Sequence, residues 1–380
     1  MLRLIVQYNK KPCYDIVFTK DFKSLKEELN PAEGADDGKS VIFPDTKEKK
    51  LCIITDSNVD KLYGKEVLKE LKACARSVSK FVFEAGEENK TLDTVKEAYK
   101  FLIENGFDRK DMLVALGGGV VGDLTGYVAA TYLRGVDFIQ IPTTLLSQLD
   151  SSIGGKTGVD FDGYKNMVGA FKMPRLVYMN ISTLKSLDDR QFYSGFAEVM
   201  KHGLIKDSKF YEWQIENMYE ICERDLDVLT ELVERSCMIK KAVVEKDPEE
   251  KGERALLNFG HTIGHAIEKY MNFTMLHGEC VALGCVAAAY ISLKRELLSA
   301  DEYYEIRDMF VPFNLPISID NIDAKEILRL TKSDKKMEAG RVKFILLKKI
   351  GKAYIDRTVT DEEILAAIEE INFSEGDMRE

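Results

Sequence analysis

The chain has 380 residues and a formal net charge of −10, with 45% hydrophobic and 31% charged residues. This length exceeds one ordinary hydrophobic core and predicts two domains, while the composition is that of a soluble globular protein. The negative charge disfavours a nucleic-acid partner, whose phosphates would be repelled, and means that any anionic substrate needs a local cationic pocket.

No run approaches the ~18 apolar residues of a membrane span, and the first residues lack the apolar core of a signal peptide. The seven cysteines include no C-x-x-C pair, which argues against a disulfide framework and for a reducing compartment. We therefore expect a cytoplasmic protein without a membrane partner.

The first 50 residues predict two short strands, at 2–8 and 14–19, as a hairpin around Lys10–Pro12. The polar segment 30–50, rich in Gly, Asp and Lys, is expected to be a surface loop or small hairpin.

Short apolar runs and helical periods alternate from residue 51 onward. Predicted strands lie at 51–55, 80–83, 112–116, 138–141 and 175–179, with helices at 59–75 and 91–105. This alternation is typical of βαβ units, in which helices cover both faces of a parallel sheet. We therefore predict an α/β N-terminal domain, residues 1–180, with a Rossmann-like, mostly parallel sheet.

The strand at 112–116 leads directly into a glycine-rich turn, Gly117–Asp123, and then into an apolar helix. This turn satisfies G-x-G-x-x-G in its required context, because glycines let the backbone approach a pyrophosphate and the helix N-terminus supplies N–H groups. The alternative is a tight turn that only packs against its own helix. The next strand ends without an acidic residue, so Asp56, which closes an earlier strand, is the better candidate for the ribose partner.

A second polar segment, Pro142–Thr157, combines adjacent hydroxyls, a Gly-Gly pair and Lys156. It suits contacts to phosphate or hydroxyl groups. It is not a P-loop, because Asp150 stands where that motif requires its first glycine.

Strand signals nearly stop after residue 180. Helical periods occupy 189–204, 226–246, 254–270, 278–295, 300–310 and 361–371, and two strands are expected at 342–347 and 351–355. We predict a mainly α-helical C-terminal domain, residues 181–380, and expect ligands in the cleft between the domains.

Three of the four histidines, His261, His265 and His277, lie close together in the sequence. On a helix His261 and His265 would share one face, a turn apart. The alternative is a set of core histidines with satisfied ring nitrogens, but such histidines need not cluster. Neutral imidazoles plus a carboxylate, with one open position, form a catalytic zinc site, and Glu198 is the candidate carboxylate.

Together these motifs resemble the dehydroquinate synthases, a branch of the sugar phosphate cyclases. The resemblance covers about residues 56–371 and is strongest in 117–126, 134–156, 165–171, 197–201, 254–268 and 277–284. It implies a dehydroquinate synthase-like fold and a homodimeric enzyme that depends on NAD and one divalent metal, zinc or cobalt. The implied substrate is a sugar phosphate, 3-deoxy-D-arabino-heptulosonate 7-phosphate, converted to 3-dehydroquinate and phosphate in the shikimate pathway of aromatic amino acid biosynthesis.

The resemblance assigns the metal to Glu198, His261 and His277, and makes His265 an acid/base group beside it. Implied NAD contacts are Asp56, Glu87, Lys90, Gly118, Gly119, Val120, Val121, Gly122, Asp123, Thr143, Thr144, Lys156, Lys165, Thr183, Leu184, Lys185 and Ser186. The implied substrate shell is Asp150, Lys156, Asn166, Lys201, Lys240, Arg254, Asn258 and Lys335, with Arg134 near the phosphate. Lys336 adjoins Lys335, and either of the two could face the substrate. For each lysine taken singly, a solvated surface charge is the alternative.

The implied reaction explains why these residue types are needed. Oxidation of a hydroxyl to a ketone acidifies the adjacent C–H, so that a proton and phosphate can leave before re-reduction and an intramolecular aldol closure. A Lewis-acidic metal lowers the pKa of the hydroxyl, and His265 handles its proton. Arginine and lysine hold carboxylate and phosphate through charge-assisted bonds of about 1.5–3 kcal/mol each.

Three rival functions share parts of this pattern. Another sugar phosphate cyclase would differ in its substrate. A metal- and NAD-dependent polyol dehydrogenase of related fold would not need Arg134, Lys156, Lys240 and Arg254. A non-catalytic NAD-binding sensor or partner subunit should have lost metal ligands or His265, and none is missing. Residues 1–50 resemble the family weakly, and 30–50 looks like an insertion.

Overall fold

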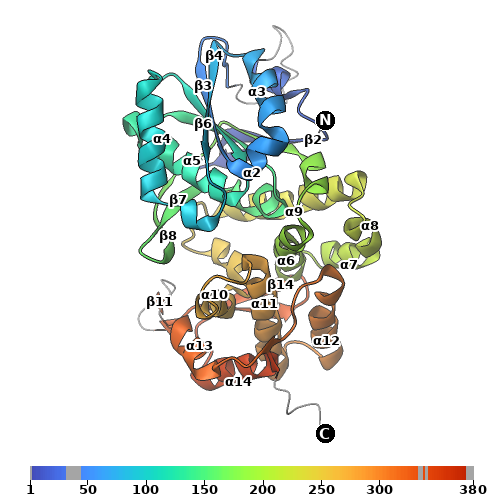
Figure 1. The fold of residues 1–380 in the computed structure, drawn as a ribbon. Coiled ribbons are helices and arrows are strands. Elements are labelled where there is room, and N and C mark those ends of the chain that lie inside the picture. Colours follow the sequence, from blue (N-terminus) through green and yellow to red (C-terminus); the bar gives the residue numbers. More distant parts are fainter. Residues whose placement is uncertain (1, 31–43, 333–336, 339–340, 374–380) are drawn as a thin grey trace. The chain divides into compact units, whose positions relative to one another are not determined.

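The computed structural model describes residues 2–30, 44–332, 337–338 and 341–373 (Figure 1). The chain forms two compact units, Met1–Leu187 with Leu229–Pro248, and Asp188–Val228 with Glu249–Glu380. Most of helix α9, Leu226–Lys246, therefore belongs to the first unit. The domain boundary expected at residue 180 stays a prediction.

A seven-stranded sheet in the order β1-β2-β9-β6-β5-β3-β4 organises the first unit (Figure 1). The strands are β1 Leu2–Tyr8, β2 Lys11–Thr19, β3 Lys50–Asp56, β4 Ser77–Phe83, β5 Met112–Gly117, β6 Asp137–Pro142 and β9 Leu176–Asn180. The β1–β2 pair is antiparallel, and the other neighbouring pairs are parallel. The predicted Rossmann-like, mostly parallel sheet is confirmed.

Both faces of this sheet are covered by helices. The helices are α1 Leu25–Leu29, α2 Ser57–Val59, α3 Lys65–Lys72, α4 Leu92–Glu104 and α5 Gly119–Thr131. Cys52 and Ile54 of β3 pack in one core with α4 and α5, whereas Leu51 and Ile53 pack in the other with α1 and α3. Because successive strand residues point to opposite faces, a strand buried on both sides needs the continuous apolar runs seen in the sequence.

The N-terminal hairpin is confirmed, with its second strand beginning at Lys11 instead of residue 14. The two turn residues, Asn9 and Lys10, have φ values of 52° and 61°. Positive φ at both central positions gives the turn twist that matches two antiparallel strands.

A second hairpin of the first unit was not predicted. It pairs β7, Lys156–Phe161, with β8, Tyr164–Phe171. Most side chains of β8 are partly or fully exposed, so the strand carries polar residues such as Lys165 and Asn166. A strand without a buried face lacks the alternation by which strands are recognised in a sequence.

The second unit is mainly helical, as predicted. Its helices are α6 Asp189–Lys206, α7 Ser208–Glu216, α8 Met218–Cys222, α10 His261–Tyr270, α11 His277–Lys294, α12 Ala300–Asp308, α13 Ala324–Thr331 and α14 Asp361–Ile371. Helix α11 is buried along most of its length and contacts α6, α10, α12 and α14. The late strand pair is β13 Phe344–Lys349 with β14 Lys352–Asp356. Among the described helices, none combines the length and apolarity that a membrane crossing requires.

The single helix predicted for 254–270 is wrong. A 3-10 helix, Glu253–Asn258, ends before Gly260, and α10 begins at His261. Gly260 has a φ of 78°, and a Cβ there would lie 2.8 Å from the backbone nitrogen of Cys285 on α11. Glycine is therefore required both by the left-handed backbone and by the close approach of α11.

Helices α10 and α11 touch through their backbones. A Cβ on Gly264 would lie 2.8 Å from the Cys280 carbonyl oxygen, and one on Gly284 would lie 1.9 Å from the Gly260 carbonyl oxygen. These contacts hold the start of α10, and thus His261, against α11.

We expect Gly284→Ala to destabilise the protein by about 3 kcal/mol, at the upper end of overpacking costs, because a backbone oxygen cannot rotate out of the way. Urea denaturation of the variant and the wild type measures this difference. A loss within the ~0.5 kcal/mol typical of neutral surface changes would contradict the close contact of the two backbones.

Candidate functional site

The three side chains predicted to hold a metal converge in the second unit. Glu198 lies on α6, His261 opens α10 and His277 opens α11. The Nε2 atoms of His261 and His277 lie 3.4 Å and 3.3 Å from Glu198 Oε1. One potential ligand atom from each residue lies within 4.8 Å of the others. Two imidazole nitrogens and a carboxylate oxygen form the donor set of a catalytic zinc or cobalt site, so these residues fit the implied metal.

An oxygen atom lies behind each ring: a backbone carbonyl behind His261 and a carboxylate behind His277. His261 Nδ1 donates to the Phe259 carbonyl oxygen at 3.1 Å, which leaves the lone pair on Nε2, the nitrogen nearer Glu198. Behind His277, Nδ1 lies 3.9 Å from Glu268 Oε2. Burial lowers the pKa of His277, but the two carboxylates, Glu198 and Glu268, outweigh burial and raise that pKa to about 9. A metal that binds this ring must displace its proton.

His265 lies beside this cluster but is not among the potential metal ligands grouped with Glu198. Its ring centroid lies 5.1 Å from that of His261 and 5.9 Å from that of His277. It instead forms a second group of potential ligands with Glu268 and His277. This position suits the acid/base role implied by the resemblance, and both the role and the ligand set stay predictions.

Glu268 was not predicted from the sequence as a residue of this site. It follows His265 by three residues and His261 by seven, so a helix places all three on one face. That spacing could have identified it as the carboxylate behind a ligand histidine.

Other predicted substrate residues of the second unit surround the cluster or lie near it in sequence. Lys201 forms an ion pair with Glu198, and both side chains are buried. Arg254 is buried on the 3-10 helix, and Asn258 Nδ2 donates to Glu250 Oε1 at 2.7 Å. Lys335 and Lys336 lie outside the described residues, so their assignment stays a prediction.

The glycine turn of the first unit joins β5 to α5. Gly118 is the N-cap of α5 and provides no side chain to cap the helix N–H groups. Nearby, the Thr143 backbone donates to the Gly117 carbonyl oxygen at 3.0 Å, and the buried Thr143 hydroxyl has no hydrogen-bond partner among the described residues. Uncapped N–H groups and an orphaned hydroxyl suit the oxygens of a pyrophosphate, so the turn fits the implied dinucleotide. The Val121 side chain is part of the core, which leaves its backbone for any contact, and Val120 packs partly against that core.

A buried lysine, Lys90, connects three other predicted residues of the first unit. Lys90 Nζ donates to Asp123 Oδ2 at 2.7 Å and to Asn166 Oδ1 at 2.6 Å, and it lies 3.6 Å from Glu87 Oε1. Burial lowers the pKa of Lys90, but the charges of Asp123 and Glu87 outweigh burial and hold that pKa above its usual value. Lys90 is therefore a fixed cation beside the first turn of α5.

The remaining predicted cofactor contacts lie at the ends of strands or just beyond them. Asp56 Oδ1 accepts from the backbone of Asn58 and Val59 at 2.9 Å and so caps α2. The Thr144 hydroxyl contacts that of Ser147 at 2.9 Å, and Thr183 Oγ1 accepts from Gln148 Nε2 at 3.1 Å. Beyond Thr183, Leu184 is buried, Lys185 is exposed, and the Ser186 hydroxyl contacts that of Tyr63. Lys156 and Lys165 lie on the β7–β8 hairpin.

Lys240 and Asp150 pair within the first unit. Lys240 Nζ lies 2.5 Å from Asp150 Oδ1 and also contacts the Asp150 carbonyl oxygen. Lys240 comes from α9, in the predicted second domain, but its segment packs with the first unit.

Arg134 lies beyond the C-terminal end of α5, whereas the glycine turn precedes that helix. It ends the 3-10 helix Tyr132–Arg134 with a φ of 69°, and its exposed side chain makes no hydrogen bond or ion pair with the described residues. The 13 residues of α5 separate it from Gly118 by about 20 Å. Its predicted place near the substrate phosphate stays a prediction.

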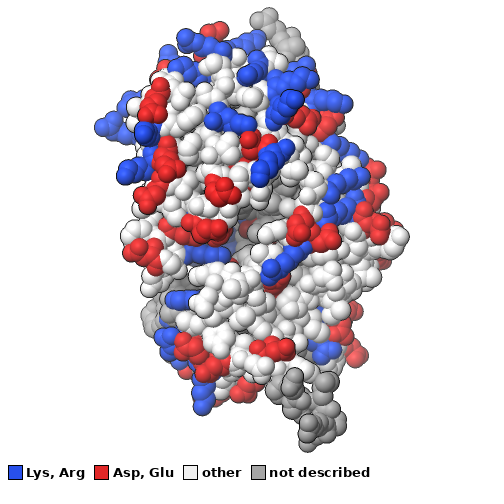
Figure 2. Space-filling view, viewed as in Figure 1, with Lys and Arg blue, Asp and Glu red and all other residues white. Residues whose placement is uncertain are grey.

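Four of the predicted basic residues differ from ordinary surface charges. Lys90, Lys201, Lys240 and Arg254 are each at most 5% exposed. Figure 2 shows acidic and basic side chains mixed over one face of the described residues. A buried cation is costly unless it pairs with an anion, and Lys90, Lys201 and Lys240 pair with Asp123, Glu198 and Asp150. The alternative of a solvated surface charge therefore does not hold for these four residues.

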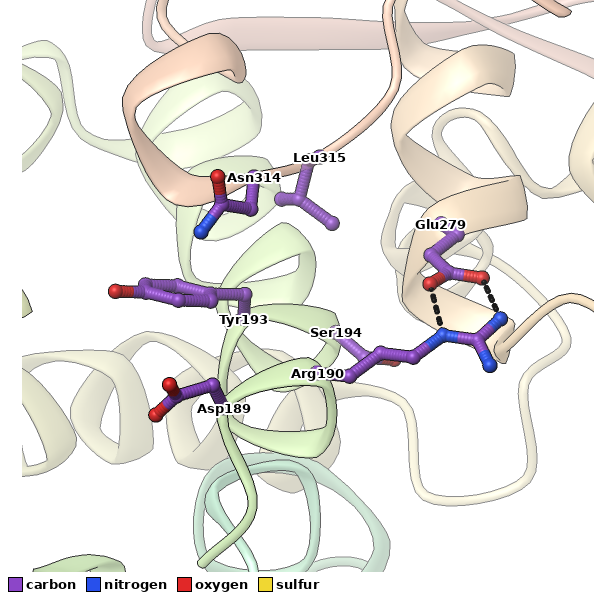
Figure 3. Close-up of a pocket in the computed structure, with 7 residues that line it drawn as sticks. All are labelled: Asp189, Arg190, Tyr193, Ser194, Glu279, Asn314 and Leu315. Atoms are coloured by element: carbon purple, nitrogen blue, oxygen red, sulfur yellow. Dashed lines mark hydrogen bonds and ion pairs between the residues drawn. The ribbon is translucent and has the colours of Figure 1, made fainter.

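A pocket of about 240 Å³ opens in the second unit (Figure 3). Its lining residues are Asp189, Arg190, Tyr193, Ser194, Glu279, Asn314 and Leu315. None of the three candidate metal ligands lines it, although Glu279 follows His277 by two residues. The pocket is thus distinct from the histidine cluster.

Comparisons with known proteins agree with the resemblance. Residues 80–194 and 195–337 match the models for the 3-dehydroquinate synthase N-terminal and C-terminal domains. The chain is 48% identical to a 3-dehydroquinate synthase of Acetivibrio thermocellus over 319 residues, 84% of this chain and 89% of that protein.

Two solved cyclase structures share the fold over nearly the whole chain. One is 2-deoxy-scyllo-inosose synthase complexed with carbaglucose-6-phosphate, NAD+ and Co2+, with a TM-score of 0.85, 25% identity and coverage of 97% of this chain and 100% of that one. The other is 2-epi-5-epi-valiolone synthase from Streptomyces hygroscopicus with NAD+ and Zn2+, with a TM-score of 0.84, 26% identity and coverage of 96% and 98%. On the strength of the family matches, this chain belongs to the 3-dehydroquinate synthase family.

Proposed function

We propose that this protein is a 3-dehydroquinate synthase, which converts 3-deoxy-D-arabino-heptulosonate 7-phosphate to 3-dehydroquinate and phosphate. The observation that carries the proposal is its 48% identity to a 3-dehydroquinate synthase over 84% of the chain. The convergence of Glu198, His261 and His277 supports a catalytic protein over a sensor, because a sensor has no need of a metal centre. The solved cyclases of other substrates are less similar in sequence, at 25% and 26% identity.

The proposed cofactors are NAD and one divalent cation, as in those two cyclase structures. When bound, the cation supplies Lewis acidity and NAD supplies a reversible hydride acceptor. Glu198 and the two histidine Nε2 atoms would hold the cation. The glycine turn, the Thr143 hydroxyl and the Lys90–Asp123 pair would hold NAD, with the other predicted contacts around them.

The chain's own residues have three tasks in the proposed reaction. His265 takes the proton of the hydroxyl that is oxidised, for which its position beside the histidine cluster is suitable. Buried cations such as Lys201 and Arg254 bind the substrate's carboxylate and phosphate and so fix its orientation. Asp150 holds Lys240 in place by their ion pair.

The decisive experiment measures inorganic phosphate released from the heptulosonate phosphate with NAD well below the substrate concentration. Metal-free protein should release none, and Zn2+ or Co2+ should restore release, because the hydroxyl needs its pKa lowered before oxidation. Since the reaction has no net redox change, substoichiometric NAD should suffice. Glucose 6-phosphate serves as the control substrate.

Two results would contradict the proposal. Full turnover in the metal-free protein would defeat the metal assignment. Faster phosphate release from glucose 6-phosphate than from the heptulosonate phosphate would point to another cyclase.

We further propose a homodimer in a reducing cytoplasm. The family resemblance supports the dimer, and the seven free cysteines support the compartment. Light scattering during gel filtration tests the dimer.

A further inference from the structure

Helices α6 and α11 face each other through three consecutive contacts. Arg190, Ser194 and Glu198 are spaced by four residues on α6, which puts them on one face of the helix. Their partners, Glu279, Gly278 and His277, are consecutive residues in the first turn of α11. The candidate ligand pair Glu198–His277 is thus the last of three contacts between the same two helices.

The first contact is a two-pronged ion pair (Figure 3). Arg190 Nε donates to Glu279 Oε1 at 2.6 Å, and Nη2 donates to Glu279 Oε2 at 2.8 Å. Nη2 also lies 3.3 Å from the Thr274 carbonyl oxygen, and Glu279 Oε2 accepts from the Leu276 backbone at 2.8 Å. The pair therefore holds the chain on both sides of His277.

The second contact brings the two backbones together. The Gly278 N–H donates to Ser194 Oγ at 3.0 Å, and a Cβ on Gly278 would lie 1.8 Å from the Ser194 carbonyl oxygen. No side chain fits there, so α11 begins directly against α6. One helical turn further along α6, Glu198 Oε1 lies 3.3 Å from His277 Nε2.

We propose that Arg190 and Glu279 are positioning residues that keep His277 within reach of the metal shared with Glu198. The inference rests on the proposed function, since it concerns the affinity of the metal site. Arg190 is 56% exposed, and an exposed ion pair contributes little to global stability. Its two parallel hydrogen bonds instead fix the relative position of two helices, as a bidentate arginine does better than a lysine.

The test is a metal titration of Arg190→Gln and Glu279→Gln in the full-length protein, with Co2+ in competition against a chelator of known affinity. Each variant should bind Co2+ about 10-fold more weakly, the lower end of the effect seen when outer residues of a metal site are removed. The double variant should be little weaker than either single one, because the two side chains act as a unit. The visible spectrum of bound Co2+ should change, because it reports the ligand geometry.

The matched control is Arg329→Gln. Arg329 makes the same kind of two-pronged pair with Glu326, but within helix α13 and with 66% of its side chain exposed. This control should bind Co2+ within twofold of the wild type.

Different results overturn different claims. Co2+ affinity and spectrum within twofold of wild type in Arg190→Gln and Glu279→Gln would overturn the positioning role, even if both variants melted at lower temperature. If the wild-type protein bound no Co2+ at all, the metal assignment would fail and this inference with it.

Discussion

Glu198→Ala is expected to abolish metal binding and turnover and to lower the free energy of unfolding by about 3–5 kcal/mol. Glu198 supplies the oxygen that faces both candidate ligand histidines, so its loss leaves two imidazoles for the metal. The stability loss has a separate cause. Lys201 pairs with Glu198, and its side chain is only 2% exposed, so the substitution leaves a buried charge without its carboxylate.

A second variant separates these two effects. Glu198→Ala combined with Lys201→Met removes both charges, and replacing a buried ion pair by apolar groups is often neutral for stability. The double variant should therefore regain most of the lost unfolding free energy but neither the metal nor the activity. Urea denaturation and metal content measured on the same preparations decide the matter. A single Glu198→Ala variant as stable as the wild type would show that the ion pair is unimportant for folding.

His265→Ala is expected to retain the metal but to lose roughly 10²–10⁴-fold in turnover, the usual contribution of general acid–base catalysis. His261→Ala is expected to lose both. The difference arises because His261 Nε2 faces Glu198 Oε1, whereas His265 belongs to the group formed with Glu268 and His277.

Metal content and phosphate release, measured on both variants, test this assignment. The two residues lie on one helix, so each variant is a control for the other's effect on folding. If His265→Ala were the metal-free form and His261→Ala kept its metal, the two roles would be reversed.

Local patterns predicted the parts of the fold that depend on near neighbours. The apolar runs at 51–55 and 112–116 became strands buried on both faces, and the glycine turn after Leu116 joined a strand to a helix as its spacing required. The break at Gly260 was missed because the helical period continues across it. Gly260 has a left-handed backbone there, and a Cβ on it would meet a carbonyl and an amide of α11, an approach that no local pattern records.

The candidate site was predictable in its residue types but not in its arrangement. The clustered histidines and the resemblance suggested Glu198, His261 and His277, and the structure brings them together. Arg134 is predicted to lie near the substrate phosphate. It follows α5, whose length separates it from the glycine turn, and its place in the site stays a prediction. The helical spacing of Glu268 from His265 is visible in the sequence, but its approach to His277 is not, and neither is the ion pair of Arg190 with Glu279. Both contacts form only when the helices pack.

The sequence by itself determined most of the strands and helices, because these depend on residues close together in the chain. It determined the family and the set of chemically capable side chains through motifs spread over about residues 56–371. Tertiary structure alone decided which carboxylate meets which histidine, since Glu198 and His277 are 79 residues apart. They meet because Gly278 lets α11 begin against the backbone of α6, and Gly264 and Gly284 let α10 lie against α11. Contacts between distant backbones depend on how the helices pack, and that packing is a property of the whole unit.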